Sequence, residues 1–315
     1  MIRILANDGI HPAGQAKLEA AGYEVVTTKV PQDRLAAELP NYAAVCVRSA
    51  TKIRQPLIDA CPDLKAIGRG GVGLDNIDVA YARERGIRVV NTPAASSRAV
   101  AELAFAHVLG LARSLHRAND EMRHGGDFKK LKKAYAGGVQ LKGRILGVVG
   151  LGRIGREAAR IGIGLGMRVV AADPGTDGID LALELAGVEA QPVVRIDTVP
   201  LGELLAAADV VTLHVPSQGG RPVIGPEEMK QVRRGAILVN TARGGLIDED
   251  ALLAALESEQ VAAAALDVFE GEPTPREDLL RHPRISVSPH IGAATGEAQE
   301  LIGLELADQL IEVLG

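Results

Sequence analysis

The stretch Ile145–Arg160, ILGVVGLGRIGREAAR, constrains the fold more than any other part of the chain. An apolar run typical of a buried strand leads into the pattern Gly150-x-Gly152-x-x-Gly155, and a helical pattern follows at once. In this context the first glycine permits a tight turn, the second lets a phosphate approach the backbone, and the third lets the helix pack on the strand. The stretch therefore predicts a doubly wound domain that binds a dinucleotide.

The choice of dinucleotide depends on the next strand-like run. The pyrophosphate is expected at the helix N-terminus, near the amides of Arg153 and Ile154. The following apolar run ends in Asp173, whose carboxylate can accept hydrogen bonds from ribose hydroxyls and would repel a 2′-phosphate. No Lys or Arg follows in DPGTDG to bind such a phosphate. The pattern favours NAD over NADP.

Short apolar runs alternate with helical stretches along all 315 residues. The first series of expected strands is Ile2–Ala6, Glu24–Thr28, Ala44–Arg48, Lys65–Gly68 and Arg88–Asn91. The second is Ile145–Val149, Arg168–Ala172, Val210–Val215, Ala236–Asn240, Ala262–Val268 and Ile285–Ser288. This alternation predicts two α/β domains with parallel sheets covered on both faces. One long helix is expected from Ser97 to Met122, followed by a loop in RHGGDFKKLKKAYAGG.

The bulk composition excludes several classes of protein. A net charge of -5 gives no reason to expect a nucleic-acid partner. No run of about 20 apolar residues could span a membrane, and the short first strand is no signal peptide. Cys46 and Cys61 form no CxxC pair and no metal-ligand spacing, so we expect two buried thiols and no metal site. The sequence is typical of a soluble cytoplasmic protein.

An enzyme that moves a hydride to or from a carbonyl carbon needs a group that exchanges a proton near neutral pH. Of the seven histidines, His214 and His290 follow apolar strands, where doubly wound sheets place their sites, and position alone does not separate them. His107 and His116 lie on the long helix and are expected to be packed or solvated. The others, in polar loops, are His11, His124 and His282.

Arg243 follows the apolar run AILVN in a Gly-rich turn. An arginine cannot accept amide hydrogen bonds and so cannot cap the next helix, whereas Asp248 and Glu249 can serve that end. The glycines after Arg243 leave its guanidinium free to meet a carboxylate. Two acids in DVFEGEP, Glu270 and Glu272, are either exposed turn residues or a partner for a catalytic histidine.

The segments GLGRIG, NTARGGLIDE, ALDVFEGEP and SPHIGAAT, in this order, resemble the D-isomer-specific 2-hydroxyacid dehydrogenase family. VRSATKI, GRGGVGLDNID and VVNTPAASSRAVAELAF also match its pattern, so the resemblance covers essentially the whole chain. It implies that Arg243 binds the substrate, that His290 is the acid/base, and that Glu272, not Glu270, is its carboxylate partner. It places His214 on the cofactor side without a chemical role.

The resemblance also implies further contacts. Cofactor contacts are expected from Val72, His214, Val215, Pro216, Thr241, Ala242, Asp267, Gly292 and Ala293. Substrate contacts are expected from Arg48, Ser49, Arg69, Gly70, Gly71 and Val72, with the amides around Gly71 and Val72 binding the substrate carboxylate. Val72 stands where some members carry a threonine, which puts one cofactor contact in doubt.

By the same resemblance, the fold should be two doubly wound parallel-sheet domains with a cleft between them. Residues 1–95 plus 292–315 are expected to form a discontinuous substrate domain, and residues 96–291 the NAD domain. A homodimer formed through the long helix region is also implied. Because the chain ends at Gly315, no C-terminal regulatory extension is expected.

The sequence leaves more than one candidate for the substrate. Arg48, Lys52 and Arg69 favour a phosphorylated acid, 3-phosphoglycerate, as in serine biosynthesis, although they could also be solvated surface charges. Glyoxylate or hydroxypyruvate is the alternative substrate, and an NAD-sensing corepressor-like protein is the alternative of another class. The cluster Lys129, Lys130, Lys132 and Lys133 either reaches a neighbouring subunit's site or belongs to a solvated loop.

Overall fold

The computed structural model describes all residues from 1 to 315 and divides them into two compact units. The first contains Met1–Ala99 and Ala293–Gly315, and the second contains Val100–Gly292. Each unit is built on its own parallel sheet, so the predicted α/β class with two parallel sheets is confirmed.

The first unit has a five-stranded sheet in the order β2-β1-β3-β4-β5, with every neighbouring pair parallel. Its strands are β1 Arg3–Ala6, β2 Glu24–Val26, β3 Ala44–Val47, β4 Ala66–Arg69 and β5 Arg88–Asn91. Parallel strands end at the same edge of a sheet, and Val47 pairs with Arg69 in register. The loops after β3 and β4 are therefore neighbours.

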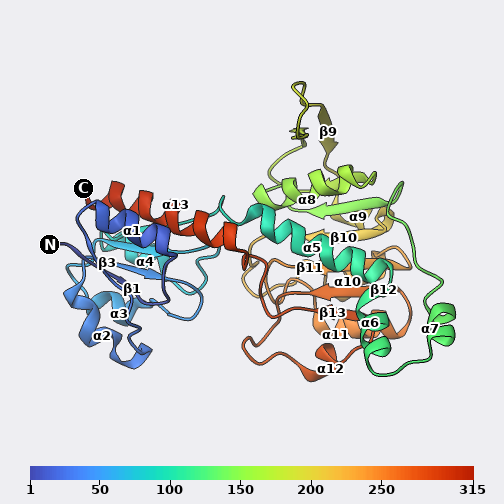
Figure 1. Cartoon of the computed structure of the whole chain (residues 1–315), viewed down its shortest axis with the longest axis horizontal. Helices are drawn as coiled ribbons and strands as arrows, with labels where there is room; N and C mark the ends of the chain where they lie inside the picture. The colour runs from blue at the N-terminus through green and yellow to red at the C-terminus, as the bar shows by residue number, and fades with distance from the viewer. The chain divides into compact units, whose positions relative to one another are not determined.

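Helices cover both faces of this sheet. Successive strand residues point to opposite sides, so Ile4 and Ala6 pack with one set of helices and Leu5 with the other. The first set is α1 Pro12–Ala20 and α13 Gly296–Leu314, which lie side by side (Figure 1). The second set is α2 Leu35–Glu38, α3 Gln55–Asp59 and α4 Val79–Glu84, with short 3-10 turns at Gln32–Arg34 and Leu39–Asn41. A Cβ on Gly14 would lie 2.3 Å from the Gly303 oxygen, so this glycine permits the close approach of α1 and α13.

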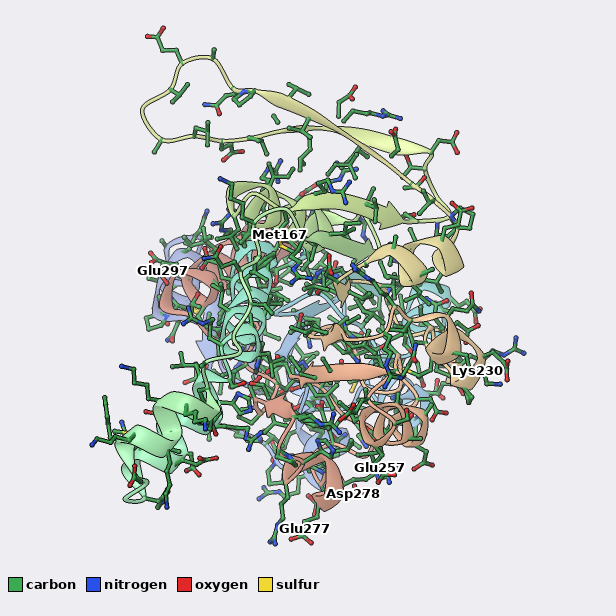
Figure 2. All side chains as sticks on the ribbon, turned by 90° about the vertical axis from the view of Figure 1, so that its right-hand side faces the viewer. Met167, Lys230, Glu257, Glu277, Asp278 and Glu297 are labelled. Atoms are coloured by element: carbon green, nitrogen blue, oxygen red, sulfur yellow. The ribbon has the colours of Figure 1, made fainter.

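The second unit has a six-stranded parallel sheet in the order β13-β12-β11-β10-β6-β7. Its strands are β6 Ile145–Val149, β7 Arg168–Ala172, β10 Val210–Leu213, β11 Ala236–Asn240, β12 Val261–Leu266 and β13 Ile285–Val287. One face packs on α5 Ser97–Ala112 and α8 Arg153–Gly164, and the other on α9 Leu201–Ala207, α10 Pro226–Gln231 and α11 Glu249–Glu257. Figure 2 shows the charged side chains of Lys230 and Glu257 on the outer side of their helices, with Glu277 on α12 Glu277–Leu280.

Three parts of the second unit differ from the sequence-based expectation. The long helix is broken, because α5 ends at Ala112 and α6 runs over Leu115–Arg123, with Ser114 between them at a left-handed φ of 49°. The expected Gly- and Lys-rich loop contains a further helix, α7 Phe128–Ala134. An antiparallel hairpin, β8 Gly178–Ala182 and β9 Val193–Asp197, was not predicted and projects from this unit (Figure 1).

Both cysteines are buried and unpaired. None of the helices combines the length and the apolar character needed to cross a bilayer.

Candidate active site

His290 and Glu272 form a hydrogen-bonded pair at the carboxyl ends of β12 and β13. The Nδ1 atom of His290 lies 2.8 Å from Oε2 of Glu272, and Oε1 of Glu272 accepts the amide of Phe269 at 3.0 Å. Since a carboxylate only accepts, Nδ1 carries the proton and the neutral ring presents an unprotonated Nε2. About half of the His290 side chain is exposed, so a substrate can reach it. The structure places Glu272, and not Glu270, against this histidine.

The backbone around His290 is held by Asp267, which follows β12 and is fully buried. Its main-chain oxygen accepts the amide of His290 at 2.8 Å. Its two carboxylate oxygens accept the amides of Ile291 and Gly292, each at 2.9 Å. His290 itself has a left-handed φ of 54°, which a non-glycine residue adopts only where its surroundings enforce it. Asp267, expected at the cofactor, thus holds the loop that carries His290.

Arg243 sits in a turn organised by Asn240, the last residue of β11. The Nδ2 of Asn240 donates to the main-chain oxygen of Arg243 at 2.8 Å, and its Oδ1 accepts the amide of Ala242 at 3.0 Å. Sequence reasoning gave Asn240 no role, although an Asn that ends a buried strand before a turn is a signal for such bonding. Arg243 is half-buried, and its Nη1 donates to the oxygen of Ala242 at 2.6 Å.

The Gly-rich turn between β6 and α8 has the form that a dinucleotide requires. A Cβ on Gly150 would lie 2.7 Å from the His214 oxygen, and one on Gly155 would lie 1.9 Å from the Gly150 oxygen. A Cβ on Gly152 would meet nothing within 4 Å, so the N-terminus of α8 opens onto free space at this residue. Arg153 and Ile154 form the first turn of α8, whose amides face that space. These residues fit the phosphates of NAD.

Asp173 follows β7, at the position expected to meet the ribose. Its Oδ2 accepts the amide of Leu151 at 2.7 Å and its Oδ1 accepts that of Gly175 at 2.8 Å. These two bonds fix the carboxylate beside the Gly-rich turn, and each oxygen keeps a further lone pair for a hydroxyl donor.

Two polar atoms near the ends of β10 and β11 are buried without a partner. They are Nδ1 of His214 and Oγ1 of Thr241, both expected at the cofactor. Burial lowers the pKa of His214 to about 4, and its Nε2 lies 3.0 Å from Oγ1 of Thr212. His214 is therefore neutral and has no contact with Glu272, which separates it from His290. A bound polar ligand would satisfy the two atoms.

Three of the remaining predicted cofactor residues, Val215, Pro216 and Ala242, lie at the same strand ends. Val215 packs at Gly150, where an added Cβ would lie 2.8 Å from its Cγ1. The Pro216 oxygen accepts Nε2 of Gln218 at 3.0 Å, and the buried Ala242 has its amide bound to Asn240. Ala293 belongs to the first unit, where its oxygen accepts Nε2 of Gln299 at 2.7 Å.

In the first unit, Arg48 and Ser49 are exposed on the loop after β3. Asp8 organises this loop, because its carboxylate accepts the Arg48 amide at 2.7 Å, the Thr51 amide at 3.0 Å and the Thr51 hydroxyl at 2.8 Å. Lys52 follows, also exposed. Neither Asp8 nor Thr51 was singled out from the sequence, because their pairing joins segments far apart in the chain.

The neighbouring segment runs from Arg69, at the end of β4, to Val72 and carries the amides expected at the substrate. The amide of Gly70 donates to the Val47 oxygen at 3.0 Å, and that of Gly71 donates to Oγ1 of Thr92 at 2.7 Å. The Gly71 amide is thus already engaged inside the protein. Of the two expected amides, that of Val72 remains, while the Val72 oxygen accepts from Asn91 at 2.7 Å.

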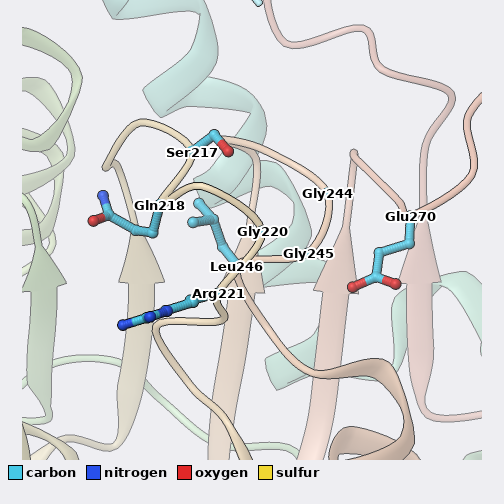
Figure 3. Close-up of a pocket in the computed structure, with 8 residues that line it drawn as sticks. All are labelled: Ser217, Gln218, Gly220, Arg221, Gly244, Gly245, Leu246 and Glu270. Carbon is cyan, nitrogen blue, oxygen red and sulfur yellow. The ribbon is translucent and has the colours of Figure 1, made fainter.

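A pocket of about 270 Å³ lies beside the Arg243 turn in the second unit (Figure 3). Loops after β10, β11 and β12 line it, and Figure 3 shows Arg221 and Glu270 on opposite sides. The Glu270 carboxylate thus lines this pocket, while its amide donates to Oε1 of Glu249 at 2.9 Å. No three or more His, Cys, Asp or Glu side chains in the chain come together in a way that could hold a metal ion.

Comparison with known proteins extends this geometry to a family. Residues 105–292 match the family described as D-isomer specific 2-hydroxyacid dehydrogenase, NAD binding domain. Hydroxypyruvate reductase of Thermotoga maritima is 40% identical over 318 residues, covering 99% of this chain and 98% of that protein. D-3-phosphoglycerate dehydrogenase of Methanocaldococcus jannaschii is also 40% identical, but this chain spans only 58% of its length.

A solved structure of a glyoxylate reductase from Paecilomyes thermophila has a TM-score of 0.84 at 30% identity, covering 98% of this chain and 94% of that one. The match extends over both units, and the reductase from Thermotoga maritima aligns over nearly its full length. The chain therefore belongs to the D-isomer specific 2-hydroxyacid dehydrogenases, NAD-dependent oxidoreductases that act on the CH–OH group of their substrates.

Proposed function

We propose that the protein interconverts 3-phosphoglycerate and 3-phosphohydroxypyruvate, with His290 as the acid/base, Glu272 as its partner and Arg243 as a substrate-binding cation. The observation that carries the proton-transfer role is the 2.8 Å bond between His290 and Glu272. That bond leaves Nε2 as the atom that takes a proton from the substrate hydroxyl or returns it. NAD, when bound, takes up or gives the hydride.

Each of the other residues has a separate task in this scheme. Arg243 binds the carboxylate of the acid and polarises its C2 oxygen, because a guanidinium can meet both oxygens at once. Glu272 stabilises the imidazolium that forms when His290 accepts the proton, and it fixes the ring tautomer beforehand. Asp173 gives the preference for NAD, since its carboxylate repels a 2′-phosphate. The residues around Gly152, His214, Thr241 and Gly292 hold the rest of the cofactor.

The choice of a phosphorylated substrate rests on the first unit, which we propose as the substrate domain. Arg48 lies on the loop after β3 and Arg69 ends the neighbouring strand β4, at the same edge of the sheet, and Lys52 follows on the loop of Arg48. Cations gathered at such an edge suit a ligand that carries a phosphate as well as a carboxylate. The chain's similarity to D-3-phosphoglycerate dehydrogenases supports the same choice.

Hydroxypyruvate is the second candidate substrate. It is favoured by the hydroxypyruvate reductase of Thermotoga maritima, which matches this chain over 98% of its own length. Hydroxypyruvate lacks the phosphate, so it would make no use of Arg48 and Lys52.

Steady-state kinetics with NADH decide between the candidates. We expect the highest kcat/KM with 3-phosphohydroxypyruvate, a lower value with hydroxypyruvate or glyoxylate, and little activity with NADPH. Arg48→Gln should lower kcat/KM for the phosphorylated substrate only. Lys65→Gln is the matched control, because Lys65 is an exposed cation at the opposite end of β4. A preference for hydroxypyruvate that Arg48→Gln leaves unchanged would establish the second candidate, and NADH binding without turnover would favour a sensor.

We also propose that the protein is a homodimer formed through α6 and α7. Leu115, Met122 and Phe128 expose 62%, 47% and 67% of their surface on these two helices, and apolar side chains grouped on one surface mark protein contacts. The lysines of α7 are exposed as well. Light scattering should give twice the chain mass, and Phe128→Glu should shift it towards the monomer.

A further inference from the structure

His107 is a polar residue on the buried face of α5. Only 8% of it is exposed, and its neighbours on this face, Ala104, Val108 and Leu111, pack in the core of the second unit. Both ring nitrogens reach serines at the end of the sheet. Nδ1 lies 2.8 Å from Oγ of Ser286, and Nε2 lies 2.9 Å from Oγ of Ser288. The ring is therefore held at both edges.

The chain of hydrogen bonds continues from Ser288 to the loop that carries His290. The Ser288 hydroxyl donates to Oδ1 of Asp267 at 2.6 Å. Asp267 in turn accepts the amides of His290, Ile291 and Gly292, through its main-chain oxygen and both carboxylate oxygens. A single partly buried path thus connects His107 to three consecutive amides around the proposed acid/base.

The donor and acceptor in each hydrogen bond of this path can be assigned by starting from the Asp267 carboxylate, which only accepts. The only proton of Ser288 goes to Asp267, so Ser288 must accept from Nε2–H of His107. The neutral ring then has an unprotonated Nδ1, which accepts from the Ser286 hydroxyl. Burial lowers the pKa of His107, which keeps the ring neutral near pH 7. His107 and Ser288 each donate once and accept once, while Ser286 donates and Asp267 accepts, so both ring nitrogens have a partner.

We propose that His107 is a positioning residue for the reaction: its Nε2–H orients Ser288 on Asp267, and Asp267 then holds the backbone of His290 in place. The inference rests on the proposed role of His290. It concerns a residue that touches neither substrate nor cofactor and that acts through Ser288 alone. His290 depends on this support because its backbone has a left-handed φ. A non-glycine residue leaves that conformation when its surroundings no longer hold it.

Substitutions at His107 can test the contacts of its two ring nitrogens separately. His107→Gln keeps a donor near the position of Nε2, His107→Asn keeps a polar group only near Nδ1, and His107→Leu removes both. His107→Leu and His107→Asn should lower kcat by about tenfold, because small displacements of a catalytic group are costly. His107→Gln should restore most of the rate. The NADH dissociation constant should change by a smaller factor than kcat in all three, because Gly152 and Asp173 do not depend on the path and only the Gly292 contact does. His124→Leu, at an exposed histidine, is the control.

Hydrogen exchange at the amides of 290–292 provides a readout that needs no turnover. His107→Leu should increase their exchange, and His107→Gln should not. Equal kcat and equal exchange in the Gln and Asn variants would overturn the proposal, and this comparison remains decisive if the Leu variant fails to fold. A lower melting temperature with unchanged kcat would show a merely structural role and would also overturn it. If the wild-type protein reduces no 2-keto acid, the proposed function fails, whereas the exchange data still decide whether His107 positions the loop.

Discussion

The side-chain amide of Asn240 bonds twice to the turn that carries Arg243: its Nδ2 donates to the main-chain oxygen of Arg243, and its Oδ1 accepts the amide of Ala242. Its main-chain oxygen also accepts the amide of Asp267 at 3.0 Å. One residue at the end of β11 thus connects the turn of the proposed substrate-binding arginine with the residue that holds the His290 loop.

Removing the Asn240 side chain should therefore affect the substrate more than the cofactor. Asn240→Ala loses two hydrogen bonds of a buried side chain, at a cost in unfolding free energy of about 1–3 kcal/mol. We expect a higher KM for the 2-keto acid and a nearly unchanged KM for NADH. Asn240→Asp, which keeps the acceptor but loses the donor to Arg243, should be intermediate. An unchanged KM for the keto acid in both variants would show that this turn does not set the position of Arg243.

The glycines of the phosphate-binding turn should respond differently to the same methyl group. Gly155→Ala would place a Cβ 1.9 Å from the Gly150 oxygen, so we expect a strongly lowered melting temperature. Gly152→Ala would meet no protein atom within 4 Å, so the fold should be kept while NADH binding weakens by about tenfold or more. Thermal unfolding and fluorescence titration measure the two effects. Unchanged NADH affinity in Gly152→Ala would place the pyrophosphate elsewhere.

Much of the fold could be predicted from the sequence because its signals are local. A buried parallel strand is a continuous apolar run, as in Ala236–Asn240, and the Gly-rich turn is read from adjacent residues. The β8–β9 hairpin was missed because only one side of it is buried, through Leu181 and Ile196, while charged residues such as Asp180 and Arg195 interrupt the run. The break at Ser114 was missed because no Gly or Pro marks it and the apolar pattern continues to Leu115.

In the candidate active site, too, local features could be predicted from the sequence and contacts made by the fold could not. Position alone did not separate His214 from His290, since both follow strands, and the difference lies in the side chain that each ring contacts in the fold. His290 meets Glu272, whereas His214 meets Thr212. The path from His107 to Ser288 joins residues 181 positions apart, and no local pattern predicts such a contact.

His214 should make the protein sensitive to acid. Burial lowers its pKa from 6.5 to about 4, so between these values the unfolded chain binds a proton that the folded protein does not. The contribution of the neutral, buried His214 to the free energy of unfolding is therefore fully present above pH 6.5. It is lost as the pH falls towards 4, by an amount on the order of 3 kcal/mol. Denaturant unfolding of His214→Gln without cofactor should show a weaker loss over this range. His124→Gln, at an exposed site, should behave like the wild type, and equal acid limbs in all three proteins would contradict the assignment.

Glu272→Gln should stop proton transfer with little effect on the fold. A glutamine can still accept the Phe269 amide, but its NH₂ group then faces Nδ1 of His290 and favours the tautomer with a proton on Nε2. That tautomer cannot accept the substrate proton, so kcat for oxidation should fall by at least about a hundredfold. Glu270→Gln is the matched control, two residues away on the same turn and lining the neighbouring pocket. Similar rates in the two variants would exclude the proposed pairing.

Glu249 should have the opposite pH dependence to His214. It is buried at the start of α11, and desolvation raises its pKa above the ordinary 4.5, with the charge of Glu270 adding to the effect. The folded protein then binds a proton more tightly than the unfolded chain, so stability falls as the pH rises from 4.5 through the raised value. Glu249→Gln should be more stable than the wild type at pH 7, and this advantage should disappear below pH 4.5. Asp250→Asn, which removes an exposed charge from the same helix turn, should show no such gain at pH 7. A Glu249→Gln variant that is less stable than the wild type at neutral pH would contradict this prediction. The ionised carboxylate would then stabilise the fold, through its bond to the Glu270 amide and its place at the helix N-terminus.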